Sequence, residues 1–140
     1  MTVEEVQNGI IGEFSLFEDW MDKYNLLIDL GKELPVIDPK YKTNDYLIEG
    51  CQSKVWLHPS FDGKIIIFRA DSDAIITRGI VALLIKVLSG RTPNEIMSAD
   101  LYFIDGIGLR QSLSPTRSNG LLAMVKQMKL YAIAYNAQRK

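Results

Sequence analysis

A single cysteine, Cys51, is the residue best suited to covalent chemistry in this chain of 140 residues. It follows Gly50 and precedes Gln52 and Ser53, so its neighbours are typical of a polar turn rather than of an apolar strand interior. Free cysteines are usually small buried hydrophobic residues. A thiol in a turn can instead be approached by another protein, and reactivity needs access as well as the thiolate form. We therefore favour a reactive thiol over a structural one.

The residue inventory argues against other common kinds of site. A structural zinc site usually needs four cysteine or histidine ligands, and the chain has one of each, so no metal site is expected. The sequence contains neither a GxxxxGK[ST] nor a GxGxxG phosphate-binding loop. A nucleophilic pair of Cys51 and His58 is also unfavourable, because a turn at the cysteine and a strand ending at His58 would place them about 15 Å apart. His58 is expected on the surface, beside a turn at 59–63.

Three charged residues lie next to expected helix starts. Asp71 and Asp73 flank Ser72 just before an apolar helix, where carboxylates complement the helix dipole. This structural interpretation is favoured over a functional one. Arg117 lies at or just before the start of the last helix, where a cation is disfavoured by up to ~1 kcal/mol. Such a residue often pairs with a carboxylate or meets a partner, so both interpretations stay open for Arg117.

The elements that position these residues begin with two amphipathic helices. Thr2 and Glu5 form a capping-box pattern, and apolar residues at helical spacing follow it. A second pattern of this kind, Ser15 to Glu18, predicts a new helix almost at once, and Pro35 ends it.

Residues 46–70 predict a small sheet. The runs YLIE, KVWLH and KIIIFRA are short and β-rich, and Asp62-Gly63 separates the second from the third. We expect three antiparallel strands, with the cysteine turn between the first two. Residues 74–88 are apolar on nearly every side and predict a buried helix that is capped by Asp71, Ser72 or Asp73 and ends near Gly90.

The remaining residues are expected to be helical. The capping box Thr92-Pro93-Asn94-Glu95 predicts a short helix, and residues 105–113 predict another. Apolar residues at alternating spacings of four and three predict a last helix that starts after Ser114 or after Ser118. The order of elements predicts an α+β fold, a single domain over 1–140 in which helices cover an antiparallel sheet of about three strands.

Composition and charge limit the classes of protein. The chain is 47% hydrophobic, yet no stretch reaches the ~18 apolar residues that a membrane span requires. The N-terminal residues lack the pattern of a signal peptide, and a lone thiol is easier to keep reduced inside the cell, so a cytoplasmic protein is expected.

The charge is unevenly distributed along the chain. Residues 1–50 hold 11 acidic and 4 basic groups, whereas residues 51–140 hold 6 acidic and 12 basic groups. We favour neutralisation of the two halves by packing over recognition of a charged protein partner. Nucleic acid is not an expected partner, because the basic residues are scattered and no binding motif accompanies them.

The run Gly50-Cys51-Gln52-Ser53-Lys54-Val55-Trp56 resembles the GCQSxVW signature of the SufE family of cysteine desulfuration proteins. Other blocks in the same order resemble family segments: Trp20 with Lys23-Tyr24, Leu30-Gly31 with Leu34-Pro35, Asp71-Ser72-Asp73-Ala74 with Gly79, and Leu113 to Leu121 followed by Ala123-Met124. The blocks cover roughly residues 20–125. The visible departure is Thr116, where the family commonly has Ser.

The resemblance implies a helper of a cysteine desulfurase in iron–sulfur cluster assembly. In that family the cysteine of the signature, here Cys51, accepts persulfide sulfur and passes it to a cluster scaffold complex. The cofactor PLP belongs to the desulfurase, so this chain needs none, and it acts as an activator and carrier rather than as an enzyme. The family fold implies helices on a curved antiparallel sheet. The sequence leaves open which desulfurase is served and whether the chain forms a homodimer.

Two alternatives from other classes remain. The chain would be an iron–sulfur scaffold if subunits shared a cluster, although one cysteine per chain argues against this. It would be a redox-sensing or structural module if Cys51 reacted only with oxidants, or with nothing.

Overall fold

The structure is a computed structural model that describes residues 1–35, 37–50, 53–109, 113 and 115–138. Its first two elements are α1 (Val3–Phe14) and α2 (Trp20–Lys32). The predicted capping box starts α1: the Glu5 N–H donates to the Thr2 Oγ1 at 3.0 Å, and the Glu5 carboxylate accepts from the Thr2 N–H at 3.1 Å. Pro35 follows the end of α2, as the sequence indicates.

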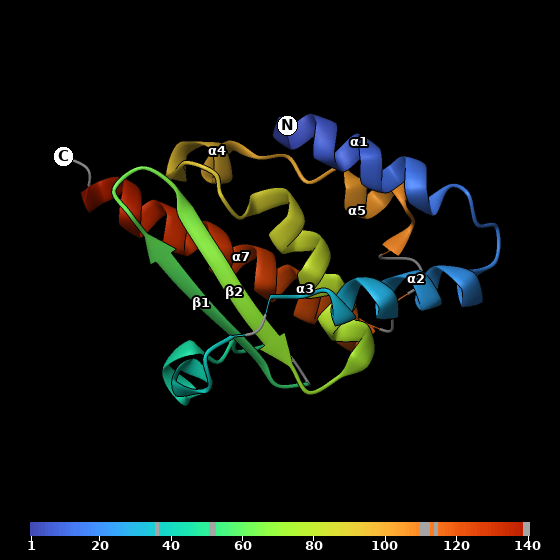
Figure 1. Ribbon diagram of the computed structural model, residues 1–140, viewed down its shortest axis with the longest axis horizontal. Helices are drawn as coiled ribbons and strands as arrows, with labels where there is room; N and C mark the ends of the chain where they lie inside the picture. Colours follow the sequence, from blue (N-terminus) through green and yellow to red (C-terminus); the bar gives the residue numbers. More distant parts are fainter. Residues whose placement is uncertain (36, 51–52, 110–112, 114, 139–140) are drawn as a thin grey trace.

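The second capping prediction is wrong in its position. Ser15 ends α1 instead, and its hydroxyl donates to the Gly12 carbonyl at 2.7 Å. The helix α2 begins at Trp20 because the Asp19 carboxylate accepts the Met21 N–H at 3.0 Å. The two helices are therefore separated by a short connection at the right of Figure 1.

The sheet has two strands, β1 (Val55–Phe61) and β2 (Ile66–Ser72), paired antiparallel from Val55 opposite Ser72 to Phe61 opposite Ile66. The turn between them contains Asp62 and Gly63, as predicted, and the Asp62 carboxylate accepts the backbone N–H groups of Lys64 and Ile65 at 2.8 Å each.

The expected first strand at 46–49 does not form in the described chain. The short 3₁₀ helices η1 (Pro39–Tyr41) and η2 (Asn44–Tyr46) occupy this region instead. Because η2 runs to Tyr46 and Gly50 takes a φ of +92°, which extended strands do not adopt, few residues remain to pair with β1. Leu47 makes one isolated bridge to Trp56, and the Ile48 N–H donates to the Val55 carbonyl at 2.8 Å.

The helix α3 (Ile75–Leu88) is the centre of the molecule and confirms the predicted buried helix. It contacts α1, α2, α7 and β2, and Ile80, Leu84 and Leu88 have at most 1% of their surface exposed. The predicted cap is wrong: α3 starts after Ala74 without a side-chain cap, because Asp71 and Asp73 bind other groups. Ser72 accepts the Ala74 N–H at 3.2 Å, one residue before the helix.

Three more helices complete the described fold, α4 (Pro93–Ser98), α5 (Phe103–Gly106) and α7 (Pro115–Gln138). The capping box at α4 is confirmed, and α7 takes the earlier of the two predicted starts. The helix predicted at 105–113 is interrupted in its described part, because α5 ends at Gly106 and Gly108 takes a positive φ of 73°; Leu109 is helical again, and residues 110–112 lie outside the described residues. The buried Gln7 of α1 fixes this region: it donates to the Asp100 carbonyl at 2.9 Å and accepts the Phe103 N–H at 3.1 Å.

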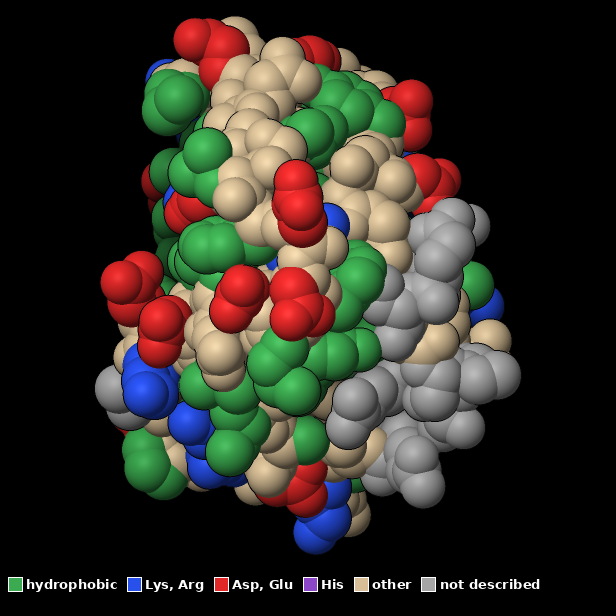
Figure 2. Space-filling view, turned by 90° about the vertical axis from the view of Figure 1, so that its right-hand side faces the viewer, with side chains coloured by type: hydrophobic (Ala, Val, Ile, Leu, Met, Phe, Trp, Pro, Cys, Tyr) green, Lys and Arg blue, Asp and Glu red, His purple; other side chains and the backbone are tan. Residues whose placement is uncertain are grey.

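The ion pairs do not support the expected neutralisation between the two halves. Among the described residues, one ion pair joins the two halves of the sequence. It links Lys42, from the acidic residues 1–50, to Asp71, from the basic residues 51–140. Glu18 and Asp22 stay exposed at the start of α2. Figure 2 shows acidic side chains spread over the face at the right of Figure 1, with fewer basic ones among them.

Candidate functional site

The cysteine segment connects the 3₁₀ helices to β1. Cys51 and Gln52 lie outside the described residues, and both of their flanks are described. On the first flank, Gly50 is exposed and takes a φ of +92°, which L side chains rarely adopt. A Cβ at Gly50 would lie 3.3 Å from the Cβ of Ala123 on α7. The backbone therefore turns closely against α7 immediately before the cysteine.

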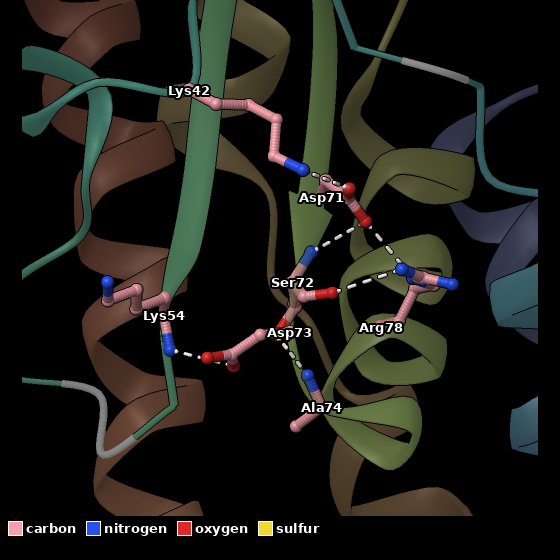
Figure 3. A network of polar contacts seen from close by, with 7 residues as sticks. All are labelled: Lys42, Lys54, Asp71, Ser72, Asp73, Ala74 and Arg78. Carbon is pink, nitrogen blue, oxygen red and sulfur yellow. Dashed lines mark hydrogen bonds and ion pairs between the residues drawn. The ribbon is translucent and has the colours of Figure 1, made fainter. Parts of the chain in front are cut away.

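The second flank is fixed by Asp73. The Lys54 N–H donates to the Asp73 carboxylate at 3.0 Å, and the Asp73 N–H donates to the Lys54 carbonyl at 3.2 Å. Figure 3 shows the carboxylate of Asp73 meeting the backbone of Lys54, whose ammonium group points away. Ser53, which precedes Lys54, is half-buried. The backbone is thus held three residues after Cys51 by two hydrogen bonds from the end of β2.

Asp71 has a different role from Asp73. Its carboxylate binds the ammonium of Lys42 and the Nε of Arg78, each at 3.0 Å, and accepts the Ser72 N–H at 2.8 Å (Figure 3). Arg78 also donates to the Ser72 carbonyl at 3.2 Å. Partial burial opposes ionisation of Asp71, but the hydrogen bonds from Lys42 and Ser72 and the charge of Arg78 outweigh it, so its pKa is lowered. Asp71 therefore joins the η1–η2 segment to β2 and α3.

The predicted site residues thus divide into three groups. Gly50, Ser53 and Asp73 lie at the cysteine segment, whereas the described contacts of Asp71 are with Lys42, Ser72 and Arg78. Arg117 lies in the first turn of α7, as predicted, and its side chain is outside the described part. Sequence reasoning missed Ala123, although it belongs to a block that resembles the family, because spacing alone does not show that α7 packs against Gly50.

His58 is placed differently from the expectation. It lies within β1, opposite Arg69, and is half-buried rather than at a strand end. Its ring stacks on Tyr41 with centroids 3.6 Å apart and meets Tyr46 edge-on at 4.9 Å. Burial lowers the pKa of His58, and the charges of Lys40 and Arg69 lower it further. The described part of the chain contains no group of three or more His, Cys, Asp or Glu residues that would hold a metal.

Comparison with known proteins identifies the family. A family model described as "SufE: Fe-S metabolism associated domain" matches residues 8–132. The chain belongs to the SufE family. Its membership associates the chain with iron–sulfur metabolism.

Relatives at moderate identity support the SufE assignment. The chain is 42% identical over 125 residues to an Arabidopsis thaliana protein named SufE-like protein 1, chloroplastic/mitochondrial, covering 89% of this chain and 34% of that protein. It is 42% identical to a SufE-like protein of Rhizobium etli, covering 86% and 84% of the two chains. It is 38% identical to one of Rhizobium meliloti, covering 86% and 89%. The chain therefore spans about a third of the Arabidopsis protein and most of the rhizobial ones.

A solved structure independently supports the α+β fold. The solution structure of a hypothetical protein from Thermus thermophilus matches with a TM-score of 0.77, covering 94% of this chain and 96% of that one. The two sequences are 17% identical, so this likeness concerns the α+β fold alone. Among the residues described here, no helix is long and apolar enough to cross a bilayer.

Proposed function

We propose that Cys51 accepts sulfur as a persulfide from a cysteine desulfurase and passes it on for iron–sulfur cluster assembly. Membership of the SufE family carries the proposal, because it associates the chain with iron–sulfur metabolism and Cys51 is the chain's one thiol. The described flanks are compatible with access by a partner, since Glu49, Gly50 and Lys54 are exposed. The cytoplasm remains the predicted location.

The chemistry requires one nucleophile from this chain. The Cys51 thiolate attacks the outer sulfur of the partner's persulfide, and a new sulfur–sulfur bond forms as the bond to the partner's cysteine breaks. The partner's cysteine leaves as a thiolate, so neither an oxidant nor a reductant is consumed. PLP would act in the desulfurase, before the persulfide reaches this chain. The desulfurase is stimulated because its own cysteine is returned for another turnover.

The residues beside Cys51 support this step by orienting the segment. Gly50 allows the close turn against α7, and Asp73 holds the backbone of Lys54. A nucleophile held in a restricted geometry loses less entropy when it meets its target. Gln52 and Ser53, which follow Cys51 in the sequence, are proposed to support its reaction.

A transfer assay with intact-mass detection tests the proposal. Incubated with a matching desulfurase and free cysteine, the wild-type protein is expected to gain one sulfur atom, on Cys51 alone. Cys51→Ser removes the nucleophile with little change in volume, so the fold should survive with a shift of ~1 kcal/mol. Sulfur transfer should then fall to background. Absence of added sulfur on the wild type, or full stimulation by Cys51→Ser, would disprove the carrier function.

Arg117 is proposed as a contact to the desulfurase, because a cation in the first turn of α7 is unfavourable for the helix itself. We expect Arg117→Ala to weaken desulfurase stimulation while the free energy of unfolding changes by less than ~1 kcal/mol. Stimulation at increasing protein concentration and denaturation by urea measure the two effects. Normal stimulation by the variant would show that Arg117 has no such role.

A further inference from the structure

A surface groove of about 450 Å³ lies between segment 44–49 and α7. One wall includes Asp45, Leu47 and Glu49, and the other includes Ala123, Lys126 and Leu130. The first wall is held to β1 by the bridge from Leu47 to Trp56 and by the hydrogen bond from Ile48 to Val55.

The lining of the groove reaches Glu49, two positions before Cys51 in the sequence. Glu49 lines it, and the next residue, Gly50, approaches Ala123 of the opposite wall so closely that an added Cβ would lie 3.3 Å away. Gly50 is bonded to Cys51. A molecule lying in the groove therefore contacts residues within two positions of Cys51 in the sequence.

The walls favour a basic and partly apolar occupant. Asp45 and Glu49 are exposed, and neither forms an ion pair with another described residue. On the facing wall, Leu130 has 45% of its surface exposed, whereas Ile48 beneath the first wall is 6% exposed. Among the described residues that line the groove, two carboxylates face one cation, Lys126, so the charge of the groove favours positive groups.

We propose that this groove binds the cysteine-bearing segment of a partner protein, and that it selects a segment with apolar and basic residues beside its cysteine. The inference rests on the proposed function, because sulfur transfer brings two sulfur atoms to bonding distance, about 2.05 Å. The residues next to the partner's cysteine must then contact the surface next to Cys51. The groove supplies that surface on the Gly50 side.

Peptide exchange tests the groove without a desulfurase. Two eight-residue peptides differ only in carrying two lysines or two glutamates beside a leucine and a cysteine, and each cysteine is activated as a mixed disulfide with thionitrobenzoate. The Cys51 thiolate attacks the peptide sulfur, a protein–peptide disulfide forms and thionitrobenzoate leaves, so its release gives the rate. The ratio of the two rates at low salt, lysine peptide over glutamate peptide, is the quantity compared between variants.

The decisive comparison uses two charge-reversed proteins. In Asp45→Lys/Glu49→Lys the ratio should fall by about fivefold, as two exposed charge pairs are lost. In Asp22→Lys/Glu33→Lys, with the same change of net charge on or just after α2, the ratio should stay at the wild-type value. An unchanged ratio in the groove variant, or an equal fall in the α2 variant, would overturn the proposal. If the wild type still gains sulfur from a desulfurase in that case, the groove proposal alone fails and the proposed function stands.

Discussion

At the scale of single residues, the two acidic side chains around Ser72 perform separate tasks. Asp71 is occupied by Lys42 and Arg78, whereas Asp73 holds the backbone that leads out of the cysteine segment. An interpretation of both as dipole-complementing residues at a helix start explains neither contact. Because their partners differ, substitution of Asp73 should affect the cysteine segment, whereas substitution of Asp71 should affect the contacts of Lys42 and Arg78.

The contact between Asp73 and Lys54 is testable by hydrogen exchange. Asp73→Ala leaves the Lys54 N–H without its acceptor, so its exchange should accelerate and the free energy of unfolding should fall by about 1 kcal/mol. Asp73→Asn retains an acceptor oxygen and serves as the matched control, with slower exchange than in the alanine variant. Equal exchange at Lys54 in all three proteins would show that the hydrogen bond does not restrain the segment.

His58 should make stability depend on pH. Its pKa is lowered in the folded protein by burial and by the charges of Lys40 and Arg69, so the unfolded chain binds the proton more readily. The stability that depends on a neutral His58 is therefore fully present above the unfolded pKa of about 6.5. It is lost as the pH falls below that value towards the lower pKa of the folded protein. His58→Gln should remove this part of the dependence, measured as the difference in urea unfolding free energy between the two proteins from pH 5 to pH 8. A difference that is constant with pH would contradict the assignment.

At the scale of elements, the close approach of α2 to α3 positions the end of β2. A Cβ at Gly79 would collide with the carbonyl of Leu27, and one at Gly31 would lie 2.9 Å from the Gly79 nitrogen. Two glycines thus let the helix backbones touch. Because α3 follows β2 directly, a shift of α3 would move the Asp71-Ser72-Asp73 segment that holds Lys54.

Two matched glycine substitutions test this packing. Gly79→Ala should destabilise the protein by about 2 kcal/mol or more, because backbone atoms of α2 must move. Gly9→Ala on α1 meets no atom within 4 Å, so relief of backbone entropy should stabilise that helix by up to ~1 kcal/mol. Thermal and urea unfolding measure both. Similar stability for the two variants would mean that the helices can separate at little cost.

At the scale of the whole molecule, one ion pair among the described residues joins residues 1–50 to residues 51–140. The acidic excess of residues 1–50 is exposed along α2 in part, and α7 carries Lys126 and Lys129 without any acidic residue. The Lys129 ammonium donates to the Ala99 carbonyl at 2.7 Å rather than to a carboxylate. Separated charge of this kind acts on partners at a distance of about a Debye length, ~8 Å at physiological ionic strength.

The sequence by itself determined the features that depend on near neighbours. The capping boxes at Thr2 and Thr92 and the apolar run of α3 involve contacts within one or two helical turns, so they could be predicted. The sequence also predicts which side chain would carry the chemistry, because the chain has one cysteine, Cys51. Its blocks of family-like residues were enough to indicate the SufE family, which the family model confirms.

Tertiary structure decided what depends on residues far apart in the chain. The bond between Lys54 and Asp73 spans 19 positions, and that between Gln7 and Phe103 spans 96, so no local spacing predicts either. The third predicted strand is absent because η2 and Gly50 leave segment 46–49 few residues for pairing with β1. Whether this segment forms a strand or a 3₁₀ helix depends on contacts with the rest of the chain. Packing of α7 against segment 44–50 likewise placed Ala123 beside Gly50 and formed the groove that Glu49 and Ala123 both line. Near-neighbour patterns were enough to predict most of the helices and the β1–β2 hairpin, whereas the contacts around the cysteine segment were not predictable, because only packing brings distant residues to contact distance.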